Sequence, residues 1–134
     1  MTLHLWDLGG RSYHHDEAIH AHAAHVILKD GIYQYDPTYH GPLLYYLTVA
    51  AFIVGGESDF TARLPIALSG VALIALAWSL RRPFGSRAAW WMALLVTLSP
   101  SCLYYGRFLR MDILEMLVAS AGVVARWRAV HGGS

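Results

Sequence analysis

Cysteine and charged residues are both scarce in this sequence. The 134 residues include a single cysteine, Cys102, which excludes an internal disulfide and any metal site built from several cysteines. Only 14% of the residues are charged, the net charge is +1, and no basic run carries interleaved aromatic residues, so nothing indicates nucleic-acid binding. The first eleven residues lack the basic and apolar stretches of a secretory signal.

Apolar residues are abundant instead. A hydrophobic content of 56% with a positive mean hydropathy does not fit a small soluble domain. We therefore predict an all-α, helical integral membrane protein with about three transmembrane helices, a short external amphipathic helix and a re-entrant or interfacial helix. The predicted transmembrane segments are residues 64–80, 88–104 and 113–125. The predicted regions are an external part (1–63), transmembrane hairpins (64–128) and a tail (129–134).

The apolar segment 43–54 is too short to cross a bilayer easily. Its dozen residues would reach about 18 Å as a helix, against a hydrocarbon core of about 30 Å. Proline, glycine and tyrosine crowd the segment just before it, which is typical of a membrane interface. We therefore expect 43–54 to form the re-entrant or interfacial helix, followed by a polar turn over 55–63.

Arginines set the predicted orientation in the membrane. Arg81, Arg82 and Arg87 share one short loop, and Arg126 with Arg128 ends the last apolar segment, so the positive-inside tendency places both groups in the cytoplasm. The turn 107–112 then lies outside. The acidic cluster near the N-terminus also lies outside if 43–54 does not cross; if it does cross, that cluster faces the cytoplasm, opposite the turn.

The acidic cluster opens a predicted short helix. Asp16 has the side chain of a helix N-cap, Glu17 would lie in the first turn, and Gly31 is a typical stop for a helix over 18–30. We expect one apolar side on this helix and a pair of histidines, His22 and His25, on another. The expected apolar side comprises Ala18, Ile19, Ala23, Val26 and Ile27.

Three polar sets are expected to meet on the outer face: residues 14–17, 39–42 and 105–112. A carboxylate near a hydroxyl can act as general base, a second can bind a divalent cation, and guanidinium groups can hold a phosphate in bidentate fashion. These properties favour chemistry with a phosphate leaving group. The candidate catalytic residues are Asp16 and Glu17; the candidate substrate-binding residues are His15, Tyr39, His40, Arg107, Arg110 and Asp112; and the candidate ligands of a divalent cation are Glu17 and His40.

Simpler explanations exist for each set. Asp16 and Glu17 could serve only as helix caps, and Arg107 and Arg110 only as anchors at lipid headgroups. The dense histidines could form a zinc site or lie solvated at the interface, but no HExxH or HxxEH pattern is present.

Four stretches together resemble a known family: HHDEAIHAHAAHVILKDGIYQYDPTYHGPLLYYL, SDFTARLPIALSG, LRRPFGSRAAW and SPSCLYYGRFLRMD. In this order and spacing they are similar to the N-terminal part of GT-C-fold membrane glycosyltransferases. The closer resemblance is to glycosyltransferase family 39, which includes dolichyl-phosphate-mannose protein mannosyltransferases and lipid A aminoarabinose transferases, in its prokaryotic subgroup often labelled flippase-activity-associated. The resemblance runs from about residue 8 to 125.

The resemblance implies roles for individual residues. The family's acidic pair in its first external loop falls on Asp16 and Glu17, with Asp16 as the general base, and its Arg-x-x-Arg-x-Asp turn falls on Arg107, Arg110 and Asp112, next to the donor phosphate. The family's proline-rich segment falls on 40–46. Family enzymes have a transmembrane helix before the acidic loop and many more spans afterwards, so the resemblance implies that this chain is a fragment, which could be inactive by itself.

The expected function is therefore that of an inverting glycosyltransferase in the cell membrane. It would transfer a sugar from a polyprenyl-phosphate-linked donor to an acceptor hydroxyl on a glycan, lipid or protein, with its active-site loop outside a multi-pass chain. The alternative is a non-catalytic accessory subunit or a factor that translocates lipid-linked sugars. A histidine-based metal transporter is disfavoured, because 64–80 and 88–104 carry no ionisable path across the bilayer.

Overall fold

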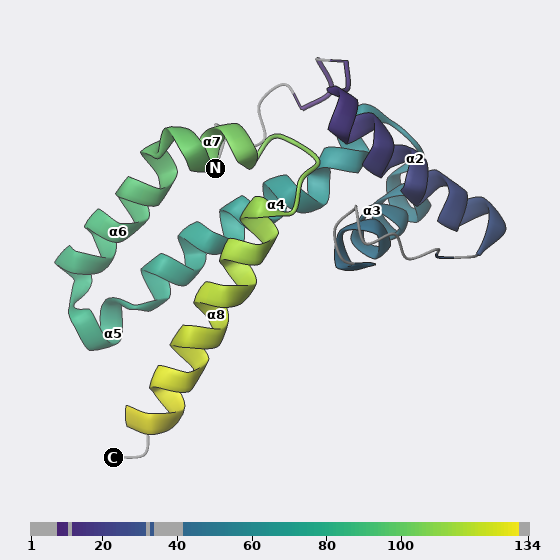
Figure 1. Cartoon of the computed structure of the whole chain (residues 1–134). Coiled ribbons are helices and arrows are strands. Elements are labelled where there is room, and N and C mark those ends of the chain that lie inside the picture. The colour runs from purple at the N-terminus through teal and green to yellow at the C-terminus, as the bar shows by residue number, and fades with distance from the viewer. Residues whose placement is uncertain (1–7, 11, 32, 34–41, 132–134) are drawn as a thin grey trace.

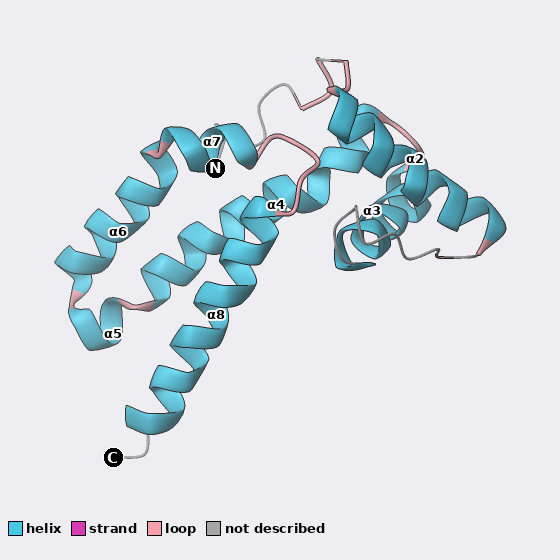
Figure 2. Cartoon of the chain, viewed as in Figure 1, coloured by secondary structure: helices cyan, strands magenta, loops and turns pink. Residues whose placement is uncertain are grey.

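The computed structural model describes residues 8–10, 12–31, 33 and 42–131. Within these residues the chain is helical and contains no strand (Figure 2). The all-α class predicted from the sequence is therefore confirmed. The helices are α2 (His15–Asp30), α3 (Pro42–Gly55), α4 (Asp59–Ser79), α5 (Arg81–Phe84), α6 (Ser86–Leu98), α7 (Pro100–Tyr105) and α8 (Asp112–His131).

Helix α4 is the axis of the fold. It packs against α3, α6 and α8, while α2 and α3 gather near its first turns and α5 follows its last turn (Figure 1). The hydroxyl of Ser58 caps its N-terminus by accepting from the N–H of Thr61 at 3.2 Å. Its 21 residues correspond to about 32 Å, close to the thickness of a bilayer core.

One helical stretch among the described residues, Asp59–Phe84, is long and apolar enough to cross a membrane. Helix α3 is apolar but has only 14 residues, or about 21 Å, as expected for the segment 43–54. Helix α8 is long enough, but it carries Asp112 and Glu115 in its first turn and Arg128 in its last. The charged side chains of α8 therefore lie toward its two ends, and its middle is apolar.

The surfaces of α6 and α8 are apolar. Only Ala89 of α6 is buried, while Trp90, Trp91 and Leu95 are at least half exposed, as are Val118 and Val123 of α8. Soluble proteins rarely expose such continuous apolar surface, whereas lipid-facing helices do so as a rule. These faces are therefore suited to contact lipid.

The core lies where α2, α3, α4 and the α7–α8 connection meet. Ala24, Leu44, Ile66 and Leu109 are fully buried there, and the start of α8 closes the cluster. Small residues on α2 let this helix lie close to its neighbours. The connection 106–111 is consequently anchored in the core, because Phe108, Leu109 and Met111 are all buried.

Two sequence predictions about helices are wrong. The segment 88–104 is not one continuous helix: it divides at Ser99 into α6 and α7, because Pro100 forces an extended backbone on the residue before it (φ −60°, ψ 120°). The predicted polar turn over 55–63 is also too long, since α4 begins at Asp59 and includes Arg63.

The predicted orientation of the first helix is wrong as well. The helix begins at His15 with His14 as its N-cap, so Asp16 lies in the first turn. Its buried side comprises Glu17, His20, Ala21 and Ala24, whereas Ala18 is exposed. Glu17 forms a buried ion pair, and this pair determines which side of the helix faces inward. The larger apolar residues of the helix, Ile19, Val26 and Ile27, are half-buried.

Candidate functional site

A buried ion pair joins α2 to α4. The guanidinium of Arg63 donates from Nε to Oε1 of Glu17 at 2.9 Å and from Nη2 to Oε2 at 3.0 Å. Both side chains are only 2% exposed. Two parallel hydrogen bonds between a guanidinium and a carboxylate form a strong, directional contact. When such a pair is buried, loss of either partner leaves an uncompensated charge inside the protein.

Backbone groups from three segments complete this pair. The N–H of His14 donates to Oε2 of Glu17 at 3.0 Å, and the N–H of Leu109 donates to Oε1 at 2.9 Å. The carbonyl of Leu8 accepts from Nη1 of Arg63 at 2.6 Å. Glu17 thus fixes α2, α4 and the α7–α8 connection relative to one another.

The charge of Glu17 is stabilised by its neighbours. Burial opposes ionisation, but the hydrogen bonds from Arg63 and from the backbone of His14 and Leu109 outweigh it and hold the pKa of Glu17 below its ordinary value. Beside the pair, burial and the carboxylate of Asp59 raise the pKa of Tyr13 to about 12, so its phenol stays neutral. The Tyr13 ring lies 5.2 Å from the Arg63 guanidinium and covers it.

An exposed cluster adjoins the buried pair. Nη1 of Arg110 lies 3.5 Å from Oδ2 of Asp16, and its Nε donates to Oδ2 of Asp112 at 3.1 Å. The three side chains are between 37% and 48% exposed. Arg110 also lies 5.9 Å from the ring of Tyr105. The carboxylates of Asp16 and Asp112 and the guanidinium of Arg110 therefore lie next to one another and are accessible to solvent.

The contact between Asp16 and Arg110 favours one of the two arrangements predicted for the acidic cluster. Had the segment 43–54 separated the acidic cluster from the turn 107–112, the two would lie on opposite membrane faces. Instead, Asp16 touches Arg110, and Glu17 accepts from the backbone of Leu109. The start of α2, the start of α4 and the α7–α8 connection therefore share one end of the molecule, hereafter the carboxylate end (Figure 1).

Comparison with known proteins identifies the family. Residues 39–134 match the family model described as dolichyl-phosphate-mannose-protein mannosyltransferase. The chain belongs to this family. No curated protein and no solved structure matches the chain. The match begins after α2, so it contains Arg63, Arg110 and Asp112 but neither Asp16 nor Glu17.

Membership of the mannosyltransferase family makes the chain part of a glycosyltransferase of the GT-C type, a class of membrane-integral enzymes. The resemblance noted in the sequence is therefore confirmed at the level of the family. It also agrees with the apolar surface of α6 and α8.

The remaining predicted site residues fall in different places. His15 is exposed at the first residue of α2, next to Asp16. Arg107 is half-buried, and its N–H donates to the carbonyl of Tyr104 at 3.2 Å. Tyr39 and His40 lie outside the residues that the structure describes.

Glu17 does not fit either predicted chemical role. Its carboxylate is 2% exposed and accepts four N–H bonds, which leaves it inaccessible to substrate and poorly suited to ligate a cation. Its predicted partner in cation binding, His40, is outside the described residues. Among those residues, no group of three or more histidine, cysteine, aspartate or glutamate side chains could hold a metal ion.

Arg63 is the site residue that the sequence reasoning missed. The predicted polar turn over 55–63 includes Arg63, although it is the one charged residue between Asp59 and Arg81. An isolated charge inside an apolar helix requires a partner within the protein, so this position was itself a signal. The partner, 46 residues earlier in the chain, could not be found from helical periodicity.

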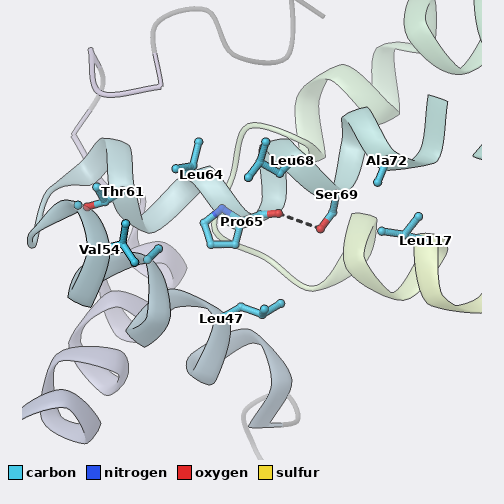
Figure 3. Close-up of a pocket in the computed structure, with 11 residues that line it drawn as sticks. Leu47, Val54, Thr61, Leu64, Pro65, Leu68, Ser69, Ala72 and Leu117 are labelled. Atoms are coloured by element: carbon cyan, nitrogen blue, oxygen red, sulfur yellow. Dashed lines mark hydrogen bonds between the residues drawn. The ribbon is translucent and has the colours of Figure 1, made fainter. Parts of the chain in front are cut away.

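An apolar groove begins close to the same turn of α4 (Figure 3). It has a volume of about 480 Å³ and lies between α3, α4 and α8. Pro65 forms part of its wall, and the Pro65 carbonyl accepts from the hydroxyl of Ser69 at 2.8 Å. Its other lining residues are Leu47, Ala51, Val54, Gly55, Thr61, Leu64, Leu68, Ala72 and Leu117.

Proposed function

We propose that this chain takes part in an inverting transfer of a sugar, with mannose as the first candidate, from a polyprenyl-phosphate-linked donor to an acceptor hydroxyl. The observation that carries the proposal is the contact between the accessible Asp16 and Arg110, 3.5 Å apart on a support made rigid by Glu17 and Arg63. The family match supports the glycosyltransferase class. The donor, the acceptor and the roles below are our assignments.

Asp16 acts as the general base. It accepts the proton of the acceptor hydroxyl as the oxygen forms a bond to the anomeric carbon, while the bond from that carbon to the phosphate oxygen breaks and the electron pair leaves with the lipid phosphate. Its side chain is 48% exposed, so an acceptor can reach it. The neighbouring His15, also exposed, is placed to contact the acceptor.

Arg110 neutralises the departing phosphate. A guanidinium carries five donors, so Arg110 can exchange its contact with Asp16 for a bidentate contact with phosphate. Entry of the donor between these two side chains would separate them and leave the carboxylate free to act as base. Asp112 holds Nε of Arg110 throughout, and Arg107 contributes a second positive charge from the same connection.

The lipid part of the donor lies in the apolar groove of Figure 3. An isoprenoid chain is apolar and flexible, and the groove is lined almost wholly by aliphatic side chains. Its lining residues Thr61 and Leu64 flank Arg63 on α4, near the carboxylate end. We further propose that Tyr39 and His40 contact substrate there, that the chain crosses the membrane more than once, and that this end faces the extracytoplasmic side.

An activity assay with matched carboxylate variants tests the proposal. Membranes containing the protein are supplied with radiolabelled dolichyl-phosphate-mannose and a hydroxyl-bearing peptide acceptor, and sugar transfer is counted. Asp16→Asn should lower transfer about 100-fold or more, because it removes a base but keeps the shape of the side chain. Asp30→Asn is the control: Asp30 is exposed at the other end of the same helix, and its loss should leave the rate unchanged.

Wild-type transfer by the Asp16→Asn protein, at equal amounts in the membrane, would remove Asp16 from the mechanism. A protein that binds the donor but transfers no sugar in any variant would instead favour the non-catalytic alternative, an accessory or translocation factor.

A further inference from the structure

A second cavity lies at the opposite end of α4. It has a volume of about 640 Å³ and lies between the last turns of α4, helix α5 and the last turns of α8. We call this end, with α5 and the beginning of α6, the basic end. The side chains of the cavity that matter here are Trp78, Arg81, Arg82, Trp127, Arg128 and His131.

The positive charge of this end has no counter-charge in the nearby sequence. The whole chain has no aspartate or glutamate between Asp59 and Asp112 and none after Glu115. In the part of the chain that the structure describes, no carboxylate forms an ion pair with Arg81, Arg82 or Arg128. Three neighbouring guanidiniums without an anion repel one another, so an external anion would be stabilised here.

The cavity is organised rather than merely charged. Arg128 donates from Nη2 to the hydroxyl of Ser79 at 3.1 Å, which ties the end of α8 to the end of α4. The Arg81 guanidinium lies 5.3 Å from the ring of Trp78. Trp127 stacks on His131 at 5.1 Å with an interplanar angle of 15°. These contacts restrict the side chains while leaving most guanidinium N–H groups available.

The walls of the cavity indicate what kind of anion fits. Indole rings line it beside the arginines, and the exposed Phe84 packs on Trp127 at 5.7 Å between ring centroids. Tryptophan next to arginine is the composition favoured at the headgroup level of a bilayer. The helical stretch that could cross the membrane also ends here, at Phe84. A ligand with a phosphate group and an apolar tail matches both kinds of wall.

We propose that this cavity binds the phosphate headgroup of an anionic membrane phospholipid. Its distinguishing chemistry is a phosphodiester held by Arg82 and Arg128, with the acyl chains passing along the indole rings. The tendency of arginine to lie on one face of the membrane depends only on its positive charge. A phospholipid site, in contrast, depends on the particular arginines that line the cavity. The proposal is independent of the sugar-transfer chemistry at the carboxylate end.

A binding experiment with charge-matched variants tests the site. The full chain, purified in a neutral detergent, is titrated with dioctanoyl phosphatidylglycerol while tryptophan fluorescence is recorded. Arg82→Gln and Arg128→Gln should each weaken binding about tenfold, as expected when a charge-assisted contact is lost. Arg126→Gln is the control, because Arg126 lies on the same helix end and carries the same charge but does not line the cavity. It should change binding less than about twofold.

Three results would overturn the proposal. Equal weakening by Arg82→Gln and Arg126→Gln would show that only net charge matters. Equal affinity for dioctanoyl phosphatidylcholine would show that the negative headgroup is not recognised. Displacement of the lipid by inorganic phosphate at the same concentration would assign the cavity to a soluble anion. Circular dichroism of each variant checks that its helices are intact, and Arg82→Lys, which keeps the charge at an exposed position, should weaken binding less than Arg82→Gln.

Discussion

Glu17 and Arg63 are 46 residues apart in the chain, yet they form a complete bidentate pair, with Nε–Oε1 and Nη2–Oε2 distances of 2.9 and 3.0 Å. This pair holds α2, which precedes the family-matched region, against α4, which lies within it. The two adjacent acidic residues therefore differ in environment: Glu17 is buried and joins the helices, whereas Asp16 is exposed beside Arg110.

Loss of the Glu17 charge should destabilise the fold strongly. Removing one partner of a buried ion pair leaves an uncompensated charge, which costs about 3–5 kcal/mol. We therefore expect Glu17→Gln to unfold at a clearly lower temperature in detergent, as measured by circular dichroism. Glu57→Gln is the control, because Glu57 pairs with His25 at the surface, where a pair contributes about 1 kcal/mol or less. Equal melting temperatures for the two variants would contradict the structural role of Glu17.

The same residue predicts a pH dependence. Because the folded protein holds the pKa of Glu17 below its ordinary value of 4.5, the unfolded state binds a proton more readily than the folded state does. The stabilisation is therefore complete above about pH 4.5 and is lost as the pH falls through the folded pKa. The difference in melting temperature between wild type and Glu17→Gln should shrink as the pH is lowered from 7 to 3. A constant difference would show that ionisation of Glu17 contributes nothing.

The sequence predicted the helices better than their contacts. Apolar runs were sufficient to locate α3 and most of α4 and α8, because burial in lipid or protein selects such runs directly. The break at Ser99 follows from Pro100, since the residue before a proline disfavours helix, whereas the prediction of one segment over 88–104 rested on apolar composition alone.

The arrangement of the site could be predicted only in part. Sequence reasoning expected the acidic cluster and the turn 107–112 to lie together, and the contact between Asp16 and Arg110 now joins them. It could not distinguish the roles of Asp16 and Glu17, because that distinction depends on a guanidinium from α4 and an N–H from Leu109, both distant in sequence. Contacts of this kind follow from tertiary packing rather than from local periodicity.

The planar shape of the Arg110 guanidinium should strengthen binding of the donor. Lysine keeps the charge but loses the planar fork, so Arg110→Lys should weaken binding of the polyprenyl-phosphate sugar by about 1–3 kcal/mol. Arg107→Lys should have an effect in the same direction. Donor affinity measured by fluorescence titration in detergent checks both. Arg87→Lys, at the basic end, is the control and should bind the donor like the wild type; unchanged affinity in the Arg110 and Arg107 variants would leave both residues as headgroup anchors.

The two ends of the molecule should lie on opposite faces of the membrane. Arg81, Arg82, Arg87, Arg126 and Arg128 gather at the basic end, and positive charge is retained in the cytoplasm, so the carboxylate end should face outward. Helix α4 supplies the required length, about 32 Å from Asp59 to Ser79. Single-cysteine variants Asp30→Cys and Arg87→Cys, each on a Cys102→Ala background, test this arrangement in intact cells with a membrane-impermeant maleimide.

Position 30 should react from outside, because it is exposed at the end of α2. Position 87 should react only after the membrane is permeabilised, since it adjoins the arginine-rich α5. The Cys102→Ala background alone serves as the blank and should stay unlabelled. Labelling of both positions from outside would mean that α4 does not cross the bilayer, and the reverse pattern would place the carboxylate end in the cytoplasm. In the second case the donor, whose phosphate we assign to Arg110, would have to be presented from the cytoplasmic face of the membrane.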